Sequence, residues 1–353
     1  MKTKKHKIII LSIMVLTILF IISCCDSVEP NPPTPPTEPD TTSHKITWEI
    51  DTLGDWQSRL RNIWGTSPEN LWAIGWIIDG SWGTNIIHYD GEKWEEYDYY
   101  EADLAGIYGF NENNIWAVGS NLILTQFYAL IAHYDGSTWK TVYIDKTSKT
   151  LMGVWGSSPN DIFAVGFEGT ILHYDGVSWT KMESNTTANL VDVWGFAPND
   201  VYACSEMDVP EKTTLLHYDG TEWESILDSM VTEPGSISSV WGTSSENVYF
   251  TSSFGFYQGS KGNGWSYSYI PDDHTAQNAL RGNSNYNIFI CGDYGLVLHY
   301  NGKTWYRYDE IFSKKYPYGP ILNGIMVFED KVFIVGEDFQ NARAIIYKGT
   351  IEN

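Results

Sequence analysis

Five histidines recur in one short motif, and metal binding is the first chemistry that they suggest. The motif reads HYDG at His88, His133, His173 and His217, and HYNG at His299. A zinc site needs three or four such side chains converging on one ion. These histidines belong to separate copies of a repeat, so ring symmetry holds them apart. We therefore predict that they are structural, and the sequence indicates neither a metal site nor a cofactor.

Paired carboxylates are the next candidates, because two of them can serve as the acid and base of a glycoside hydrolase. Such pairs occur at Asp272 and Asp273, beside His274, and at Asp98 with Glu101. Acidic pairs are common in a chain with 44 acidic residues and 22 basic ones. No GxSxG, HExxH, Walker or GxGxxG motif occurs in a suitable setting. The pattern therefore favours a non-catalytic protein, with a glycan-active hydrolase or lyase as the alternative.

The elements that must position these residues form a repeat. Its clearest copy is Leu151–Ser184, LMGVWGSSPNDIFAVGFEGTILHYDGVSWTKMES. The tryptophans that begin its last segment are spaced by 45, 40, 44, 42 and 40 residues, which is the period of a four-stranded propeller blade. Each segment is short, rich in β-branched or aromatic residues, and bounded by Gly, Asn or Asp, as strands and hairpin turns require. These tryptophans are Trp94, Trp139, Trp179, Trp223, Trp265 and Trp305.

The number of segments predicts an all-β fold, a seven-bladed β-propeller of four-stranded antiparallel blades. Seven copies of the first segment are present, but only six copies of the Trp-led segment follow residue 60. The segment Ile46–Ile50, ITWEI, matches the missing copy. We therefore predict that the N-terminal strand pairs into the C-terminal blade and closes the ring, which removes exposed sheet edges. Six or eight blades fit the count less well.

The repeat resembles the VWGSSPNDVWAVG…HYDGSTW propeller repeats of secreted and lipid-anchored bacterial proteins, across residues 44–353. The resemblance implies the fold but no activity, because propellers include enzymes, ligand binders and scaffolds. The turn Asp135–Trp139, DGSTW, is similar to the Asp-box of sialidases, but it lacks the residue between Asp and Gly. The arginines of the body do not recur at three matching inward sites, as sialidase chemistry would require. They are Arg59, Arg61, Arg281, Arg307 and Arg343.

The N-terminal segment predicts export and lipid attachment. Residues 1–23 combine four lysines with an apolar run, Ile8–Ile22, that is short for a membrane span and ends at Ser23 and Cys24. The tetrad ending at Cys24 resembles the lipobox of bacterial lipoproteins. The resemblance implies cleavage after residue 23 and attachment of acyl chains such as palmitate to Cys24, with an uncleaved signal anchor as the alternative. A proline-rich tether, residues 24–43, precedes the propeller of residues 44–353.

Location and partners are expected to follow from this anchor and from the charge. We expect a monomer held by its lipid in the bacterial envelope, at the outer membrane. Asp26 and Glu29 resemble the surface-export signals of Bacteroidetes lipoproteins, which favours the cell surface. The formal charge is −22, or −26 without the first 23 residues, so nucleic acid is excluded as a partner. Cys204 and Cys291 are predicted to be buried and not to form a disulfide.

The innermost strand of each blade should place one residue of its VWG segment toward the central channel. That residue is Trp in four copies, including Trp64 and Trp241, and we expect these rings to pack between neighbouring blades. Arg281 replaces the aromatic residue in the sixth copy. It is expected either to bind an anion in the channel or to form a salt bridge.

Function is predicted on the propeller face where the repeats differ. Loops between second and third strands and between blades share this face, whereas the SPND and DGxxW turns on the other face barely vary. The variable loops carry flat rings suited to sugar stacking or protein contact. We therefore predict a non-catalytic binding or scaffold module for a glycan or a protein, with an envelope assembly scaffold as a further alternative. The candidate ligand-binding residues are Trp76, Trp82, Tyr99, Tyr100, Phe127, Tyr128, His274, Tyr316 and Tyr318.

Overall fold

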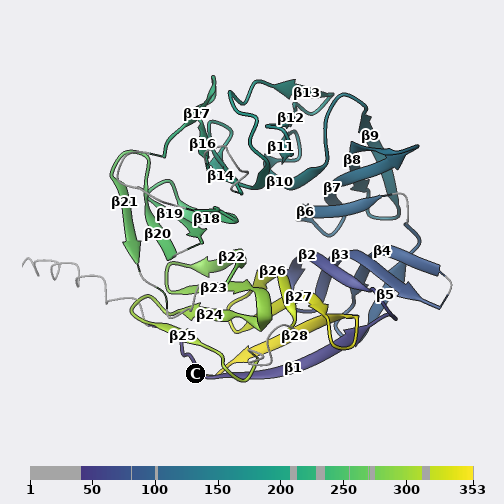
Figure 1. The fold of residues 1–353 in the computed structure, drawn as a ribbon, viewed down its shortest axis with the longest axis vertical. Helices are drawn as coiled ribbons and strands as arrows, with labels where there is room; N and C mark the ends of the chain where they lie inside the picture. Colours follow the sequence, from purple (N-terminus) through teal and green to yellow (C-terminus); the bar gives the residue numbers. More distant parts are fainter. Residues whose placement is uncertain are drawn as a thin grey trace, which may run out of the picture. The chain divides into compact units, whose positions relative to one another are not determined.

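A computed structural model describes residues 41–80, 82–99, 102–206, 213–227, 235–253, 255–268, 270, 275–311 and 319–352. These residues form seven four-stranded antiparallel sheets arranged around a central axis (Figure 1). Each sheet corresponds to one copy of the sequence repeat, so the predicted seven-bladed β-propeller is confirmed. No helix within the described residues has the length and hydropathy of a membrane span.

The first three blades follow one another along the chain, each with its first strand innermost (Figure 1). Blade one contains β2 (Arg59–Ser67), β3 (Asn70–Asp79), β4 (Trp82–Tyr89) and β5 (Trp94–Tyr97). Blade two contains β6 (Asp103–Asn111), β7 (Asn114–Ile123), β8 (Gln126–Tyr134) and β9 (Trp139–Asp145). Blade three contains β10 (Leu151–Ser158), β11 (Asp161–Gly166), β12 (Ile171–Tyr174) and β13 (Trp179–Met182).

The next three blades repeat the same meander. Blade four contains β14 (Leu190–Ala197), β15 (Asp200–Ser205), β16 (Leu215–Tyr218) and β17 (Trp223–Ser225). Blade five contains β18 (Ser239–Ser244), β19 (Asn247–Ser252), β20 (Gly255–Ser260) and β21 (Gly264–Ser268). Blade six contains β22 (Gln277–Ser284), β23 (Asn287–Gly292), a 3₁₀ turn η1 (Asp293–Gly295), β24 (Val297–Tyr300) and β25 (Trp305–Arg307).

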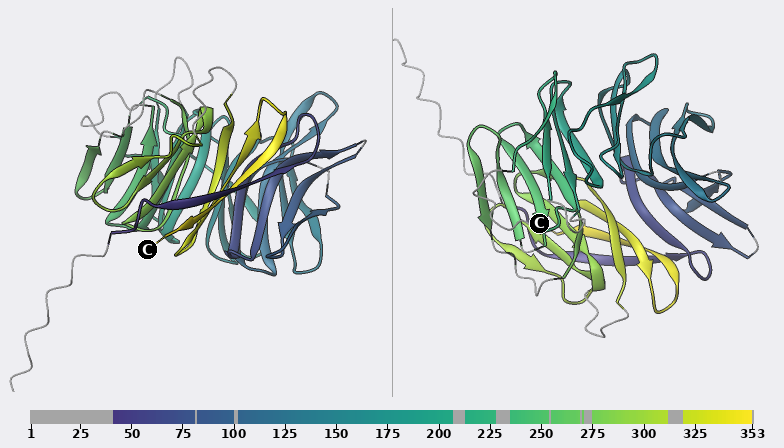
Figure 2. Two further views of the ribbon diagram at one scale, coloured as in Figure 1. Left: turned by 90° about the horizontal axis from the view of Figure 1, so that it is seen from below. Right: turned by 45° about the horizontal axis from the view of Figure 1, so that its top comes forward.

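Blade seven joins the two ends of the propeller. Its order is β1-β28-β27-β26, so the outermost strand comes from the N-terminal side of the chain. β1 pairs antiparallel with β28 from Ile46 opposite Ile351 to Leu53 opposite Ala344, which confirms the predicted closure. Figure 2 shows β1 running along the outer edge of this blade. The strands are β1 (Ile46–Leu53), β26 (Ile321–Val327), β27 (Lys331–Asp338) and β28 (Arg343–Ile351).

The DG turns explain why the third and fourth strands of a blade form a tight hairpin. In blade two, Oδ1 of Asp135 accepts hydrogen bonds from the backbone N–H groups of Ser137 and Thr138, both at 3.0 Å. Gly136 has a φ of 89°, a conformation that favours glycine. Equivalent bonds are made by Asp90, Asp175, Asp219 and Asn301.

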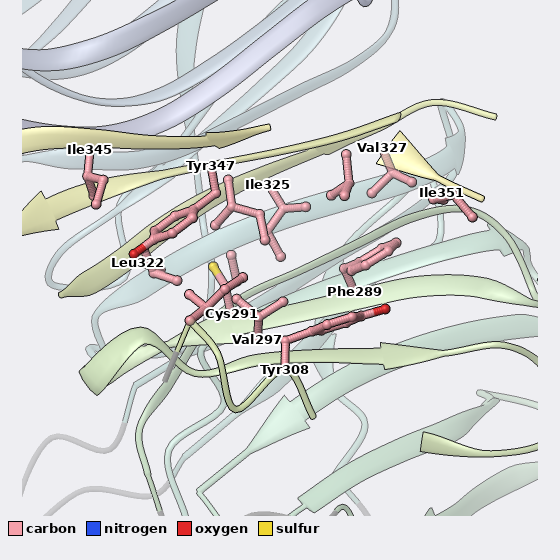
Figure 3. Close-up of a cluster of buried hydrophobic side chains, with 14 residues drawn as sticks. Phe289, Cys291, Val297, Tyr308, Leu322, Ile325, Val327, Ile345, Tyr347 and Ile351 are labelled. Atoms are coloured by element: carbon pink, nitrogen blue, oxygen red, sulfur yellow. The ribbon is translucent and has the colours of Figure 1, made fainter. Parts of the chain in front are cut away.

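The hydrophobic core lies between the blades, because each sheet is covered on both faces by its neighbours. Figure 3 shows one such cluster, in which side chains of blade six meet side chains of blade seven. Ile46 and Trp48 of the N-terminal strand pack against the same cluster. The closing strand therefore contributes apolar contacts as well as backbone hydrogen bonds. The labelled residues are Phe289, Cys291, Val297, Tyr308, Leu322, Ile325, Val327, Ile345, Tyr347 and Ile351.

The repeated histidines stabilise individual blades. In each case the ring Nε2 lies within hydrogen-bond distance of a side-chain oxygen at the start of the second strand, as in His88 with Asn70 at 2.7 Å. His217 makes the same contact with Asp200 at 2.8 Å. The motif therefore repeats because it ties the third strand to the second. The other pairs are His133–Asn114, His173–Asp161 and His299–Asn287.

The VWG tryptophans pack between neighbouring blades. A Cβ atom on Gly109 of blade two would lie 2.5 Å from the ring of Trp64 in blade one, so this ring rests directly on the next blade. Trp155 packs on Gly195 in the same way, and Trp241 packs on Gly282. Glycine at these three positions thus leaves room for the ring of the preceding blade. The cysteine prediction is also confirmed, since Cys204 and Cys291 are buried and free.

Candidate functional site

A β-bulge near the start of the innermost strand decides which side chains face the channel. In β2, Leu60 pairs with Gly75 and Asn62 pairs with Ile74, so Arg61 is an extra residue. The same shift occurs in blades two, three, four, six and seven. The extra residues, with Ser238 of blade five, line one cavity of about 570 Å³. These seven residues, which we call the mouth ring, are Arg61, Ala105, Met152, Val191, Ser238, Asn278 and Asn323.

The cavity opens on the face where the repeats differ. Its lining includes Glu206, Asp293 and Glu337, which lie at or just after the ends of second strands. The loops that connect second to third strands begin there, and the connections between blades enter the innermost strands at the same end. The channel mouth and the variable loops therefore share one face, as the arrangement of the repeats predicts.

The mouth ring is polar on one side and apolar on the other. Blades six, seven and one contribute Asn278, Asn323 and Arg61, whereas blades two to four contribute Ala105, Met152 and Val191. Nδ2 of Asn323 donates to the backbone oxygen of Leu60 at 2.9 Å, and Nδ2 of Asn278 donates to Leu322 at 3.1 Å. Both amides are thus held in fixed orientations. A ligand here meets hydrogen-bonding groups on one side and apolar surface on the other.

Two arginines and a carboxyl group face each other across blades one and seven. Arg59 and Arg61 lie on β2, and Glu337 lies on β27. Arg61 donates to Oδ2 of Asp103 at 3.1 Å, while Nε of both arginines is buried without a hydrogen-bond partner. Burial raises the pKa of Glu337, Arg59 and Arg61 oppose this effect, and Asp293 adds to it. Glu337 therefore protonates more readily than an exposed glutamate.

Arg281 joins three blades at the floor of the mouth. Its two terminal nitrogens donate to the two carboxylate oxygens of Asp192, both at 2.9 Å. The same carboxylate accepts from Oγ of Ser239 at 2.7 Å and from the backbone N–H of Val240 at 3.0 Å. Burial lowers the pKa of Arg281, but the adjacent Asp192 more than offsets this and raises it. Arg281 thus forms a salt bridge, one of its two expected roles.

Below Arg281 the channel becomes aromatic. A second cavity of about 120 Å³ is lined by Trp64, Tyr108, Trp194 and Trp241, among other residues. It shares Arg281 with the mouth, so the two cavities are adjacent. The guanidinium carbon of Arg281 lies 5.6 Å from the centre of the Trp194 ring, within the range of a cation–π contact. The polar mouth therefore rests on an apolar shaft.

The candidate residues from the variable loops lie apart from the residues that line the two cavities. Trp76 lies opposite Arg59 in the β2–β3 pair and is partly buried. Tyr99 is only 4% exposed, and its hydroxyl is 2.9 Å from Oγ1 of Thr141, so it is no exposed platform. Phe127 is 52% exposed at the β7–β8 hairpin, where the hydroxyl of Tyr128 donates to Gln126 at 2.8 Å. None of these lines the cavity.

Several other candidates lie outside the described residues. This applies to Cys24, Tyr100 and His274, and to the carboxylate pair beside His274. It also applies to Tyr316 and Tyr318. Trp82 lies in β4, but its side chain is not among those described.

The sequence did contain a signal for the mouth ring. Its members occupy the position three residues before the VWG aromatic, as Arg61 precedes Trp64 and Val191 precedes Trp194. This position varies from Arg to Ala to Asn, although the residue before it is Leu or Ile in six of the seven copies. Variation at one position of a regular strand marks a candidate site just as variation in the loops does. Trp56, 70% exposed on the connection from β1 to β2, was also missed.

Comparison with known proteins shows the fold alone. The sequence matches no protein-family model and no curated protein sequence. The structure of YCF48 bound to D1 peptide is 16% identical with a TM-score of 0.63, covering 89% of this chain and 100% of that one. Selenomethionine-substituted virginiamycin B lyase from Staphylococcus aureus is 10% identical with a TM-score of 0.67, covering 87% and 100%. The WD40 propeller domain of Doa1 is 11% identical with a TM-score of 0.63, covering 87% and 98%.

Proposed function

We propose that this protein is a non-catalytic binding module that takes a glycan at the mouth of its channel. The observation that carries this proposal is the mouth ring, in which every blade adds one side chain to a single cavity of about 570 Å³. Ligand sites are commonly concave, with a few fixed polar groups on a rigid frame. The oriented amides of Asn278 and Asn323 and the guanidinium of Arg61 are groups that suit sugar hydroxyls.

An exposed ring on the same face supports a glycan over a protein as the ligand. Trp56 lies three residues before Arg59, on the connection between blades seven and one. Flat aromatic surfaces stack on the apolar faces of sugar rings. The apolar half of the mouth ring, Ala105 with Met152 and Val191, offers further contact of the same kind.

The anchor is a separate part of the proposal. Cys24 is lipidated after cleavage of the signal peptide, and the proline-rich tether displays the propeller from the outer membrane, at the cell surface. Incorporation of labelled palmitate should disappear in Cys24→Ser and persist in the control Cys25→Ser. Equal labelling of both variants, or none in the wild type, would reject the anchor without affecting the binding site.

Glycan binding is tested with the full-length protein in detergent on an array of bacterial, plant and host glycans. Binding should fall at least about tenfold in Asn323→Ala, because one fixed hydrogen-bonding group is lost and others are left unpaired. Phe127→Ala, on an exposed hairpin outside the cavity, is the control. Binding to no glycan would reject the proposal, as would binding that depends on Phe127 but not on Asn323.

A hydrolase or lyase is a second candidate because of Glu337. A carboxyl group with a raised pKa can donate a proton, and Glu337 shares the cavity with Asp293 and Glu206. New reducing ends or unsaturated products, lost in Glu337→Gln, would establish an enzyme. An envelope assembly scaffold would instead be indicated by outer-membrane defects on deletion, without any glycan binding.

A further inference from the structure

The arginines of the propeller, unlike its lysines, are concentrated at one place. The chain beyond its first 23 residues carries a formal charge of −26 and only five arginines. Three of these, Arg59, Arg61 and Arg281, line the mouth cavity. The other two, Arg307 and Arg343, do not line it. Such clustering in an acidic protein indicates a local requirement for guanidinium groups.

The three arginines differ in how many hydrogen bonds and ion pairs their guanidinium groups make within the protein. Arg281 directs both terminal nitrogens to Asp192 and is committed to the fold. Arg61 makes one contact with Asp103, and Arg59 has no ion pair with any residue in the described ranges. Nε of Arg59 and of Arg61 is buried without a partner. The terminal nitrogens of Arg59 are therefore not committed to an ion pair within the described residues, and a guanidinium group matches a carboxylate.

The opposite wall carries acidic groups as well, namely Glu206, Asp293 and Glu337. Burial raises the pKa of Glu337, whereas the positive charges of Arg59 and Arg61 oppose this effect. A glutamate that protonates more readily repels an anion less than an exposed glutamate does. Asp293 is held by the amide of Asn278 at 3.0 Å. An acidic ligand can thus lie between the arginines of blade one and the amides of blades six and seven.

We infer that the mouth selects sugars that carry a carboxylate, with the carboxylate of a uronic acid against Arg59 and Arg61. Its hydroxyls lie toward Asn278 and Asn323. This inference rests on the proposed glycan-binding function and names its ligand class. The negative charge of the whole body repels polyanions at long range. Binding of a short acidic sugar therefore depends on these two arginines and not on general attraction.

Titration calorimetry on the full-length protein in detergent tests the inference. The probes are oligogalacturonate, oligoalginate and a hyaluronan fragment, each paired with its carboxyl-reduced counterpart. We expect at least one acidic probe to bind about 10- to 100-fold more tightly than its reduced partner, as for a hydrogen bond to a charged group. Arg59→Gln should remove this preference, because it lowers the affinity for the acidic probe more than that for the reduced sugar. The control Arg343→Gln makes the same charge change on the exposed start of β28.

The outcomes separate this inference from the proposed function. Equal affinity for each acidic probe and its reduced partner would overturn the inference and leave glycan binding in place. Absence of binding to any glycan would overturn both, and tight binding of an acidic peptide instead would identify a protein partner. Because the paired sugars are compared on the wild type, the test does not depend on a variant folding. Arg59→Lys, which keeps charge but loses the fork, should give an intermediate preference.

Discussion

Breaking the ion pair between Arg281 and Asp192 should measure how strongly the channel wall holds three blades together. Arg281→Met introduces the residue that Met326 provides at this position in blade seven, and Asp192→Asn introduces the residue that Asn62 provides in blade one. The Arg281 side chain is 22% exposed and that of Asp192 is 12% exposed, so each would be left as a mostly buried charge.

The expected magnitude follows from the remaining contacts. Removing one partner of a buried pair costs about 3–5 kcal/mol. Arg281→Met should lie at the lower end, about 3 kcal/mol, because Asp192 keeps donors from Ser239 and Val240. Asp192→Asn should cost a similar amount, since Arg281 loses its counter-charge. The double variant should be more stable than the sum of the two losses predicts, by about 2 kcal/mol.

Urea unfolding, followed by tryptophan fluorescence, provides these free energies for the four proteins of the cycle. The slope of the unfolding free energy with urea should stay unchanged, which shows that the variants unfold from the same closed ring. A coupling energy below about 0.5 kcal/mol would refute the reasoning, because independent sites add within that range. An Arg281→Met protein as stable as the wild type would refute it too.

Deleting residues 1–53, which removes β1 (Ile46–Leu53), should open the ring, expose the edge of β28 and cause association in size-exclusion chromatography. A Cβ atom on Gly109 would lie 2.5 Å from a Trp64 ring atom, so Gly109→Ala should lower the unfolding free energy by about 1–3 kcal/mol in urea. Burial lowers the pKa of His299 to about 3, with a smaller effect from His44. The unfolded chain, with a histidine pKa near 6.5, therefore binds more protons, and stability should fall as the pH falls from about 6.5 toward 3. Gln258 occupies the matching position of blade five, opposite Tyr249 as His299 is opposite Phe289. His299→Gln should therefore reduce this loss by about 2–3 kcal/mol at pH 4.5.

Each of these results has a matched control. Deleting only residues 1–40 should leave a monomer. A peptide of residues 41–56, added to the protein that lacks residues 1–53, should restore the monomer. If the protein that lacks residues 1–53 stays monomeric and unfolds like the wild type, closure by β1 contributes nothing to stability. A Cβ atom on Gly262 would meet no other atom within 4 Å, so Gly262→Ala should be neutral, and equal effects at both glycines would contradict the packing argument. Parallel pH profiles for wild type and His299→Gln would contradict the titration argument.

The fold was predictable because its determinants are local and repeated. Alternating residues define strands, and Asp135 with Gly136 defines a hairpin turn without help from distant parts of the chain. The C-terminal repeat lacks its Trp-led segment, and ITWEI near the N-terminus matches that segment. The N-terminal strand was therefore expected to close the ring. The site was harder to predict, because the variable loops supplied most of its candidate residues and Arg281 was the one candidate in the channel. Tyr99 illustrates the difficulty, since a tyrosine in a variable loop can still be buried against a neighbouring blade.

By itself, the sequence determined the seven blades, the strand order, the turn chemistry and the role of the N-terminal strand. Only the tertiary structure decided which side chains meet in the channel. Arg281 and Asp192 are 89 residues apart, and no local pattern joins them. The bulge that turns Arg61 inward depends on its pairing with β3, and the mouth ring exists only because closure brings equivalent positions around one axis. Local periodicity encodes the blades, whereas the site is a property of the closed ring.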